Sequence, residues 1–195
     1  MRRRDLIAGV GSLGLLAGGG VLASSGLPSF DDADDSNEDD GSSDDPVTIE
    51  TIDAPGSEAG EIRVPSRERA TFVDFFATWC DPCIEQMPAL AEASDRIGDE
   101  VLFVSVTSES VGDSLTEDEL VDWWDEHDGD WTVGVDPKAE LTSRYMSGGY
   151  PFAAAFDASG RVRWSDSGVK SADDLVEGIE RALEAESDGG SGSNA

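Results

Sequence analysis

The stretch that decides the fold is 71-TFVDFFATWCDPC-83, in which a short apolar run leads directly into a pair of cysteines. Five of its first six residues are aromatic or β-branched, which predicts a buried strand at 71–76. Cys80 and Cys83 are the only cysteines of the chain and have the spacing Cys-x-x-Cys. We expect them in the first turn of a helix, where Pro82 is tolerated because the first amides of a helix have no intrahelical partner.

The spacing of the two cysteines suits thiol–disulfide chemistry. Within one helical turn both sulfur atoms reach disulfide distance, and we expect Cys80 to be exposed with Cys83 shielded behind it. The positive end of the helix favours the thiolate of Cys80, which is the nucleophilic form. One alternative is a structural disulfide, although so small a ring stabilises a fold little. Another is a zinc site, but the pair and the lone His127 supply three of the four ligands that zinc needs, so we expect no metal.

Strand and helix patterns alternate on both sides of the cysteine pair. Besides 71–76, we expect strands at 47–52 (an edge strand), 101–106, 131–135, 152–156 and 162–164. Helical spacing covers 84–97, interrupted by Pro88, and a short helix is expected at 138–145. Thr116 with Glu119 forms a capping box for another helix, and Ser171 caps the last one. This order predicts an α/β fold with helices on both faces of a central sheet.

The segments outside the expected domain, 46–186, differ from it in composition. Residues 1–30 place Arg2, Arg3 and Arg4 before an uncharged apolar run, which predicts a twin-arginine-like signal or membrane anchor. The positive-inside rule then puts the rest of the chain in an extracytoplasmic location, membrane-anchored or secreted. Residues 31–45 hold nine acids and predict an acidic disordered linker, whereas 187–195 predict a flexible Gly/Ser tail.

The net charge is strongly negative along the whole chain. There are 43 acidic and 13 basic residues, giving a net charge of −30, and residues 46–186 alone carry 32 acidic and 10 basic ones. Nucleic acid is a poor partner, because no cluster of Lys and Arg follows residue 4. Self-repulsion of this size is screened by molar salt, so we expect a protein of an extreme halophile, a halophilic archaeon. The alternative is an acidic protein that works in ordinary salt.

The motifs together resemble those of the thioredoxin family. The segment 71–83 is similar to the thioredoxin active-site segment, and Pro88 follows Cys83 at the distance of that fold's helix-kinking proline. Asp74, six residues before Cys80, corresponds to the buried aspartate of thioredoxins. The resemblance continues through 150-YPFAAAFDASGRV-162, which is similar to the segment that starts at the family's cis-proline. A thioredoxin-like fold is therefore expected, with a central mixed sheet.

The resemblance implies a two-step exchange with protein disulfides. Cys80 attacks the partner's disulfide, and Cys83 then attacks Cys80 and releases the reduced partner. Asp74, if it is buried behind Cys83, has a raised pKa and accepts the proton of that thiol. The alternative for Asp74 is a strand residue that faces solvent, since Val73 and Phe75 occupy the neighbouring positions.

The resemblance also implies which residues contact the substrate. Pro151 in the cis form puts the backbone of Tyr150 beside the sulfur atoms, whereas the alternative is an ordinary trans proline at a strand start. Trp79 is expected to shield the active site. No cofactor is expected. The partners are protein disulfide substrates and an extracytoplasmic or membrane redox partner that recycles the cysteines, and the protein is expected to be a monomer.

Within this family the chain resembles the TlpA-like (ResA-like) extracytoplasmic oxidoreductases, which serve cytochrome c maturation and related tasks. About thirty residues between 106 and 138 predict an inserted helix-strand unit, and FFATWC together with the export signal points the same way. The chain departs from the subfamily at Phe76, where a Trp is usual, and at Ala153, near a usual Thr. It also carries Gln86 where an acid is common, three residues after Cys83.

Other functions of a thioredoxin fold stay open at this point. A peroxiredoxin-like peroxidase would carry a Thr three residues before its reactive cysteine, where this chain has Ala77. A copper-delivery module would carry a His in the segment before Pro151, and none is present there. A binding module with a vestigial Cys-x-x-Cys is the third possibility. Reduction of insulin disulfides separates an oxidoreductase from all three.

Overall fold

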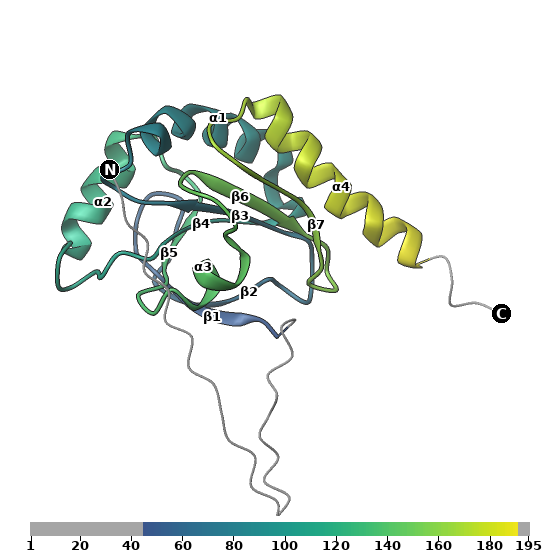
Figure 1. Cartoon of the computed structure of the whole chain (residues 1–195), viewed down its shortest axis with the longest axis horizontal. Helices are drawn as coiled ribbons and strands as arrows, with labels where there is room; N and C mark the ends of the chain where they lie inside the picture. The colour runs from purple at the N-terminus through teal and green to yellow at the C-terminus, as the bar shows by residue number, and fades with distance from the viewer. Residues whose placement is uncertain (1–44, 191–195) are drawn as a thin grey trace, which may run out of the picture. The chain divides into compact units, whose positions relative to one another are not determined.

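The computed structural model describes residues 45–190, and the side chains of residues 45–185 (Figure 1). The signal or anchor expected at 1–30, nearly all of the expected linker, and residues 191–195 of the expected tail lie outside the described residues. In the part of the chain that is described, no helix has the length and apolar character needed to cross a membrane.

One mixed sheet of seven strands forms the centre of the domain, in the order β2-β1-β5-β4-β3-β6-β7. Strand β3 pairs in parallel with β4, and β4 with β5, while the remaining pairs are antiparallel. The strands are β1 (Val47–Thr51), β2 (Gly60–Val64), β3 (Thr71–Phe76), β4 (Leu102–Thr107), β5 (Thr132–Val135), β6 (Phe152–Phe156) and β7 (Val162–Ser167). The mixed sheet of the expected fold is confirmed.

Helices cover both faces of the sheet, as expected (Figure 1). One face carries α1 (Asp81–Ile97), α2 (Glu117–Glu126) and α4 (Ala172–Gly190), and the other carries the short α3 (Glu140–Tyr145). A single 3₁₀ turn, η1 (Gly98–Glu100), follows α1. The expected insertion corresponds to α2 and β5, which lie between β4 and α3 in the chain.

The two predicted helix starts are built by reciprocal hydrogen bonds. Thr116 Oγ1 accepts from the amide of Glu119 at 3.2 Å, and Glu119 Oε2 accepts from the amide of Thr116 at 2.8 Å. Ser171 and Asp174 repeat this pattern at the start of α4, each bond being 3.2 Å long. Each pair satisfies backbone donors that a helix start leaves without a partner, so both predicted caps are confirmed.

Three details differ from the sequence-based expectation. Strand β1 is internal rather than at the edge, because β2 pairs along its outer side. The edge position belongs to β2, in which the apolar Ile62 and Val64 alternate with charged residues. Helix α4 continues to Gly190, past residue 186, where we expected the domain to end.

Alternation along β3 assigns its side chains to two cores. Phe72 and Phe76 pack in the core beneath α1, α2 and α4, whereas Val73 and Phe75 pack in the core beside α3. Because successive side chains of a strand point to opposite faces, Asp74 belongs to the α1 face. This assignment decides which groups Asp74 can serve.

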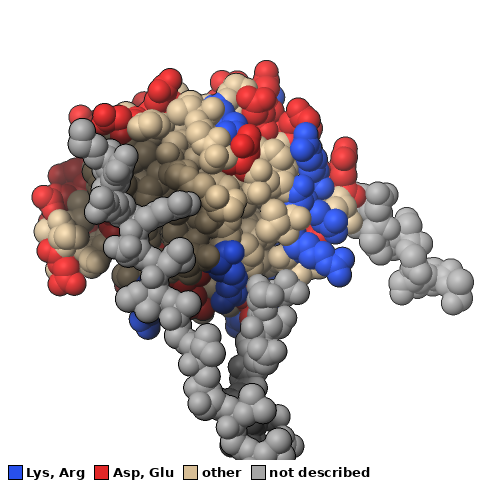
Figure 2. Space-filling view, in the orientation of Figure 1, with Lys and Arg blue, Asp and Glu red and all other residues tan. Residues whose placement is uncertain are grey.

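Exposed acidic side chains gather along the upper and left edges of the face of the domain that Figure 2 shows. Only three acids of the described part are buried: Asp74, Asp136 and Asp157. Asp136 accepts hydrogen bonds from the amides of Glu140 and Thr142 at the start of α3, and Asp157 pairs with Arg163. The other described acids are at least partly exposed, so most of their charge lies at the surface.

Candidate active site

The cysteine pair lies where the sequence placed it, at the start of α1. Cys80 is the residue that caps the helix, and its carbonyl accepts from the amide of Cys83 at 2.8 Å. The two residues are joined by a disulfide with their Cα atoms 5.2 Å apart. Pro82 occupies the first turn, as predicted.

The expectation of an exposed Cys80 is wrong for this oxidised form. Cys80 is 5% exposed and Cys83 1% exposed, so both are buried and Cys80 is the more accessible of the two. The disulfide turns the sulfur of Cys80 toward Cys83. Their relative order of accessibility still agrees with the expected roles.

A carboxylate that the sequence analysis missed holds the loop before Cys80. Glu109 accepts from the amide of Thr78 at 2.7 Å and from its hydroxyl at 2.9 Å. The hydroxyl of Thr107 donates to the same carboxylate at 3.1 Å. Glu109 follows β4 and Thr78 follows β3, so only the parallel pairing of these strands brings them together. No local sequence signal predicts this contact.

Trp79 and Tyr150 meet across the site. Trp79 is 70% exposed, and its ring lies edge-on to that of Tyr150 with the centroids 5.9 Å apart. The hydroxyl of Tyr150 forms a 2.8 Å hydrogen bond with Ser108. The peptide bond between Tyr150 and Pro151 is cis, so the alternative of a trans proline is wrong. Two of the expected substrate-contacting residues, from separate segments, thus contact each other, and Trp79 directly precedes Cys80 in the chain.

Asp74 is buried, so the alternative that it faces solvent is wrong. It is 1% exposed and accepts a hydrogen bond from Ser105 Oγ at 3.1 Å. Burial raises the pKa of Asp74 from 3.8 to about 7, because the carboxylate loses its hydration, and the Ser105 hydrogen bond lowers it only in part. A carboxyl group with this pKa is balanced between proton donor and acceptor near neutral pH.

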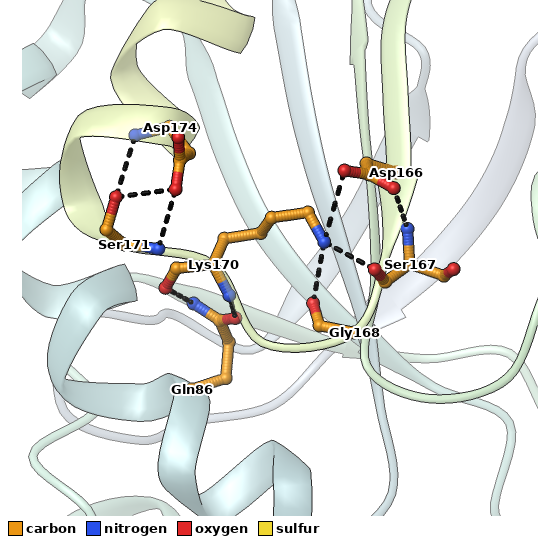
Figure 3. Close-up of polar contacts among 7 residues, drawn as sticks. All are labelled: Gln86, Asp166, Ser167, Gly168, Lys170, Ser171 and Asp174. Atoms are coloured by element: carbon orange, nitrogen blue, oxygen red, sulfur yellow. Dashed lines mark hydrogen bonds and ion pairs between the residues drawn. The ribbon is translucent and has the colours of Figure 1, made fainter.

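Gln86 ties α1 to the loop before α4 (Figure 3). It is 2% exposed, its side-chain amide donates to the carbonyl of Lys170 at 3.1 Å, and its side-chain oxygen accepts from the amide of Lys170 at 2.6 Å. A carboxylate at this position has no donor for that carbonyl. The absence of an acid three residues after Cys83 therefore has a structural reason.

The side chain of Lys170 organises the same loop. Its ammonium group reaches Asp166 at 3.3 Å, the carbonyl of Gly168 at 3.0 Å and the carbonyl of Ser167 (Figure 3). These contacts satisfy the carbonyls of the last residue of β7 and of the residue after it. Hydrogen bonds consequently connect this loop both to α1, through Gln86, and to the start of α4, through Ser171.

The fold and the cysteine pair define the class of the protein, that of thioredoxin-like folds with a Cys-x-x-Cys disulfide. More specifically, the chain belongs to the Redoxin family, whose sequence pattern matches residues 62–183.

Known proteins resemble the chain over different lengths. The thiol-disulfide oxidoreductase YkuV of Bacillus subtilis is 27% identical over 116 residues, covering 60% of this chain and 78% of YkuV. Chloroplastic thioredoxin Y of Oryza sativa subsp. japonica is 43% identical over 42 residues, which cover 22% of this chain and only 25% of that protein. The exposed lipoprotein thioredoxin of Streptococcus pneumoniae superposes with a TM-score of 0.56 at 22% identity, covering 69% of this chain and 98% of that one. The last similarity shows the shared fold.

Proposed function

We propose that the protein is an extracytoplasmic, TlpA-like thiol-disulfide oxidoreductase that exchanges its Cys80–Cys83 pair with disulfides of protein substrates. The observation that carries the proposal is the site as a whole: a cysteine pair at a helix start with a buried acid of raised pKa on the same face of the sheet. The ring contact between Trp79 and Tyr150 supports a substrate surface beside that pair.

The first step uses Cys80 of the reduced protein. Its thiolate attacks one sulfur of the substrate disulfide, a new bond forms between the two proteins, and the other substrate sulfur leaves as a thiolate. The amides of the first turn of α1 stabilise the negative charge on Cys80 before the attack. Cys80 acts first because it is the more accessible cysteine.

The second step uses Cys83 and Asp74. Asp74 takes the proton of the Cys83 thiol, and the resulting thiolate attacks the sulfur of Cys80. The Cys80–Cys83 disulfide forms, the bond to the substrate breaks, and the second substrate sulfur leaves as a thiolate. Two electrons have then passed from the protein to the substrate, and the chain has reached its oxidised form. A redox partner outside the chain restores the dithiol.

The setting and substrates follow from the N-terminal sequence and the relatives. The arginines before the apolar run of residues 1–30 support export, and a solved relative is described as an exposed lipoprotein. The TlpA-like resemblance suggests cytochrome c maturation, in which the substrate is the Cys-x-x-Cys-His heme-attachment motif. The acidic surface supports a halophilic source.

The activity is tested by reduction of insulin disulfides in molar salt. The purified protein with dithiothreitol is expected to accelerate insulin reduction, and a variant with both cysteines replaced by Ser is expected to add nothing to dithiothreitol alone. Equal rates for the two proteins would exclude the proposed activity and favour a binding module. An oxidised peptide with the heme-attachment motif, compared with insulin, tests the proposed substrate class.

Export is tested separately by replacing Arg3 and Arg4 with Lys in a native-like host. We expect the variant to stay in the cytoplasm, whereas a variant with Lys at position 2 alone is expected to be exported. Normal export of the Arg3 and Arg4 variant would contradict the twin-arginine assignment.

A further inference from the structure

Asp74 is held by a chain of two buried hydrogen bonds that the reaction steps do not use. Asp74 on β3 and Ser105 on β4 are partners in the register of the parallel pair. Ser105 Oγ lies 3.1 Å from Asp74 Oδ2, and Trp131 Nε1 lies 3.0 Å from Ser105 Oγ. Ser105 is 0% exposed and Trp131, the residue before β5, is 5% exposed. The chain of bonds is therefore shielded from water along its length.

The chemistry of the three groups fixes the direction of both bonds. An indole N–H donates and cannot accept, so Ser105 Oγ is the acceptor of Trp131. The hydroxyl of Ser105 has one hydrogen, and that hydrogen points to the Asp74 carboxyl. In the described part of the chain, Ser105 is the one side chain that hydrogen-bonds to Asp74. Bonds arranged in this way polarise one another and favour the charged carboxylate.

The ring of Trp131 is itself fixed by packing. It lies edge-on to Phe103 with centroids 5.7 Å apart and edge-on to Trp124 at 4.8 Å. Packing against these two rings therefore fixes the orientation of the indole N–H toward Ser105. A donor held in place gains more from each hydrogen bond, because little side-chain entropy is lost.

Few other groups influence the charge of Asp74. The side chains that α1, α2 and α4 bury over this face are uncharged, and the titratable ones among them are Cys80, which precedes α1, and Cys83. On the other side of β3, strand β6 places Ala153 opposite Asp74. In the oxidised protein the cysteines do not titrate, so the Ser105 hydrogen bond is the main favourable contact of the carboxylate.

We propose that Ser105 and Trp131 are positioning residues that set the proton affinity of Asp74, so that removing either hydrogen bond raises the pH at which Asp74 ionises. For the reaction, this inference rests on the proposed function, in which Asp74 takes the proton of Cys83. The pH range in which Cys83 resolves the mixed disulfide then shifts upward with Asp74.

The direct test is the titration of Asp74 in the oxidised protein in molar salt, followed by the ¹³C signal of its carboxyl carbon. Asp74→Asn identifies the signal. In Ser105→Ala the midpoint is expected to rise by about one pH unit or more, because a hydrogen bond to the charged form is lost. Trp131→Phe keeps an aromatic ring without the N–H and is expected to shift the midpoint upward by a smaller amount.

The matched control is Ser57→Ala. Ser57 is also buried, and its hydroxyl bonds the backbone of Val133 without touching Asp74. This variant is expected to lose stability and to leave the midpoint unchanged, so a general loosening of the core is distinguished from the proposed effect.

Each outcome decides one part of the inference. An unchanged midpoint in Ser105→Ala overturns it, and an unchanged midpoint in Trp131→Phe alone removes Trp131 from it. A raised midpoint that is accompanied by the same shift in the pH profile of insulin reduction supports the inference in full. A raised midpoint with an unchanged pH profile supports the role of Ser105 but contradicts the role of Asp74 under the proposed function.

Discussion

Cys80 and Cys83 sit one turn apart on the same helix, yet their surroundings differ. Cys80 caps α1 and is the more accessible, whereas Cys83 lies within the first turn and is almost completely buried. We therefore expect a protein substrate to meet the sulfur of Cys80 first once the disulfide is reduced. The roles of the two residues follow from this asymmetry.

Cys83→Ser is expected to accumulate a mixed disulfide through Cys80, because the group that breaks that bond is missing. Cys80→Ser is expected to trap nothing. Non-reducing electrophoresis and mass spectrometry of the trapped species measure both results. Recovery of a substrate on Cys83 in the Cys80→Ser protein would reverse the assigned roles.

The raised pKa of Asp74 makes the stability of the fold depend on pH. Burial raises that pKa from 3.8 to about 7. Between these values the folded state binds more protons than the unfolded state, so the free energy of unfolding falls as the pH rises. The Asp74→Asn side chain stays neutral at every pH. The free energy of unfolding of this variant is expected to exceed that of the wild type by up to about 4 kcal/mol above pH ~8, and by little at pH ~4.

Urea unfolding of the two oxidised proteins at both pH values measures this difference. The comparison cancels the effect of the surface acids, which are common to both. A constant difference across the pH range would show that Asp74 titrates alike in the folded and unfolded states, contrary to the expected linkage.

At the scale of single residues, the sequence predicted the reacting residues better than the residues that hold them in place. The positions of Cys80, Cys83 and Asp74 follow from spacing and from family resemblance. Glu109 and Ser105 did not stand out, since each acts on a residue about thirty positions earlier through strand pairing. A periodic pattern describes one helix or strand at a time, so it cannot predict which side chains of two strands become neighbours.

At the scale of elements, the contact between α1 and the loop before α4 depends on one amide. Gln86→Glu loses the donor for the carbonyl of Lys170 and places a negative charge beside that carbonyl. We expect a loss of about 1–3 kcal/mol in the free energy of unfolding. Glu85→Gln, at the exposed neighbouring position, is expected to change stability by less than about 0.5 kcal/mol.

Chemical unfolding in molar salt compares these two variants with the wild type. Equal stability of the Gln86→Glu protein would mean that the carboxyl is protonated or that the loop has moved, and the proposed reason for the missing acid would be wrong.

The elements themselves were predictable to different degrees. Caps at Thr116 and Ser171 combine a side-chain donor and acceptor within four residues, so local sequence is enough to find them. Strand β2 was missed although Ile62 and Val64 alternate with charged residues, because five residues at a sheet edge give a weak pattern. Its position outside β1 depends on which strands pair, and the periodicity of a single strand carries no information about its partner.

At the scale of the whole molecule, charge is expected to govern stability. The described acids are at least partly exposed apart from three, and residues 46–186 hold 32 acids against 10 bases. Screening of this repulsion is expected to raise the melting temperature by about 10 °C or more between about 0.1 M and about 3 M KCl. Calorimetry across the salt series measures it, and a flat or falling melting temperature would contradict a halophilic source.

The cysteine pair closes a ring of only four residues within one turn of α1. Opening so small a ring releases almost no chain freedom, since the same helix still holds both ends. We therefore expect the oxidised and the reduced protein to share this scaffold, without refolding between cycles. We expect a partner to distinguish the oxidised from the reduced protein at the sulfur atoms and at the neighbouring rings of Trp79 and Tyr150.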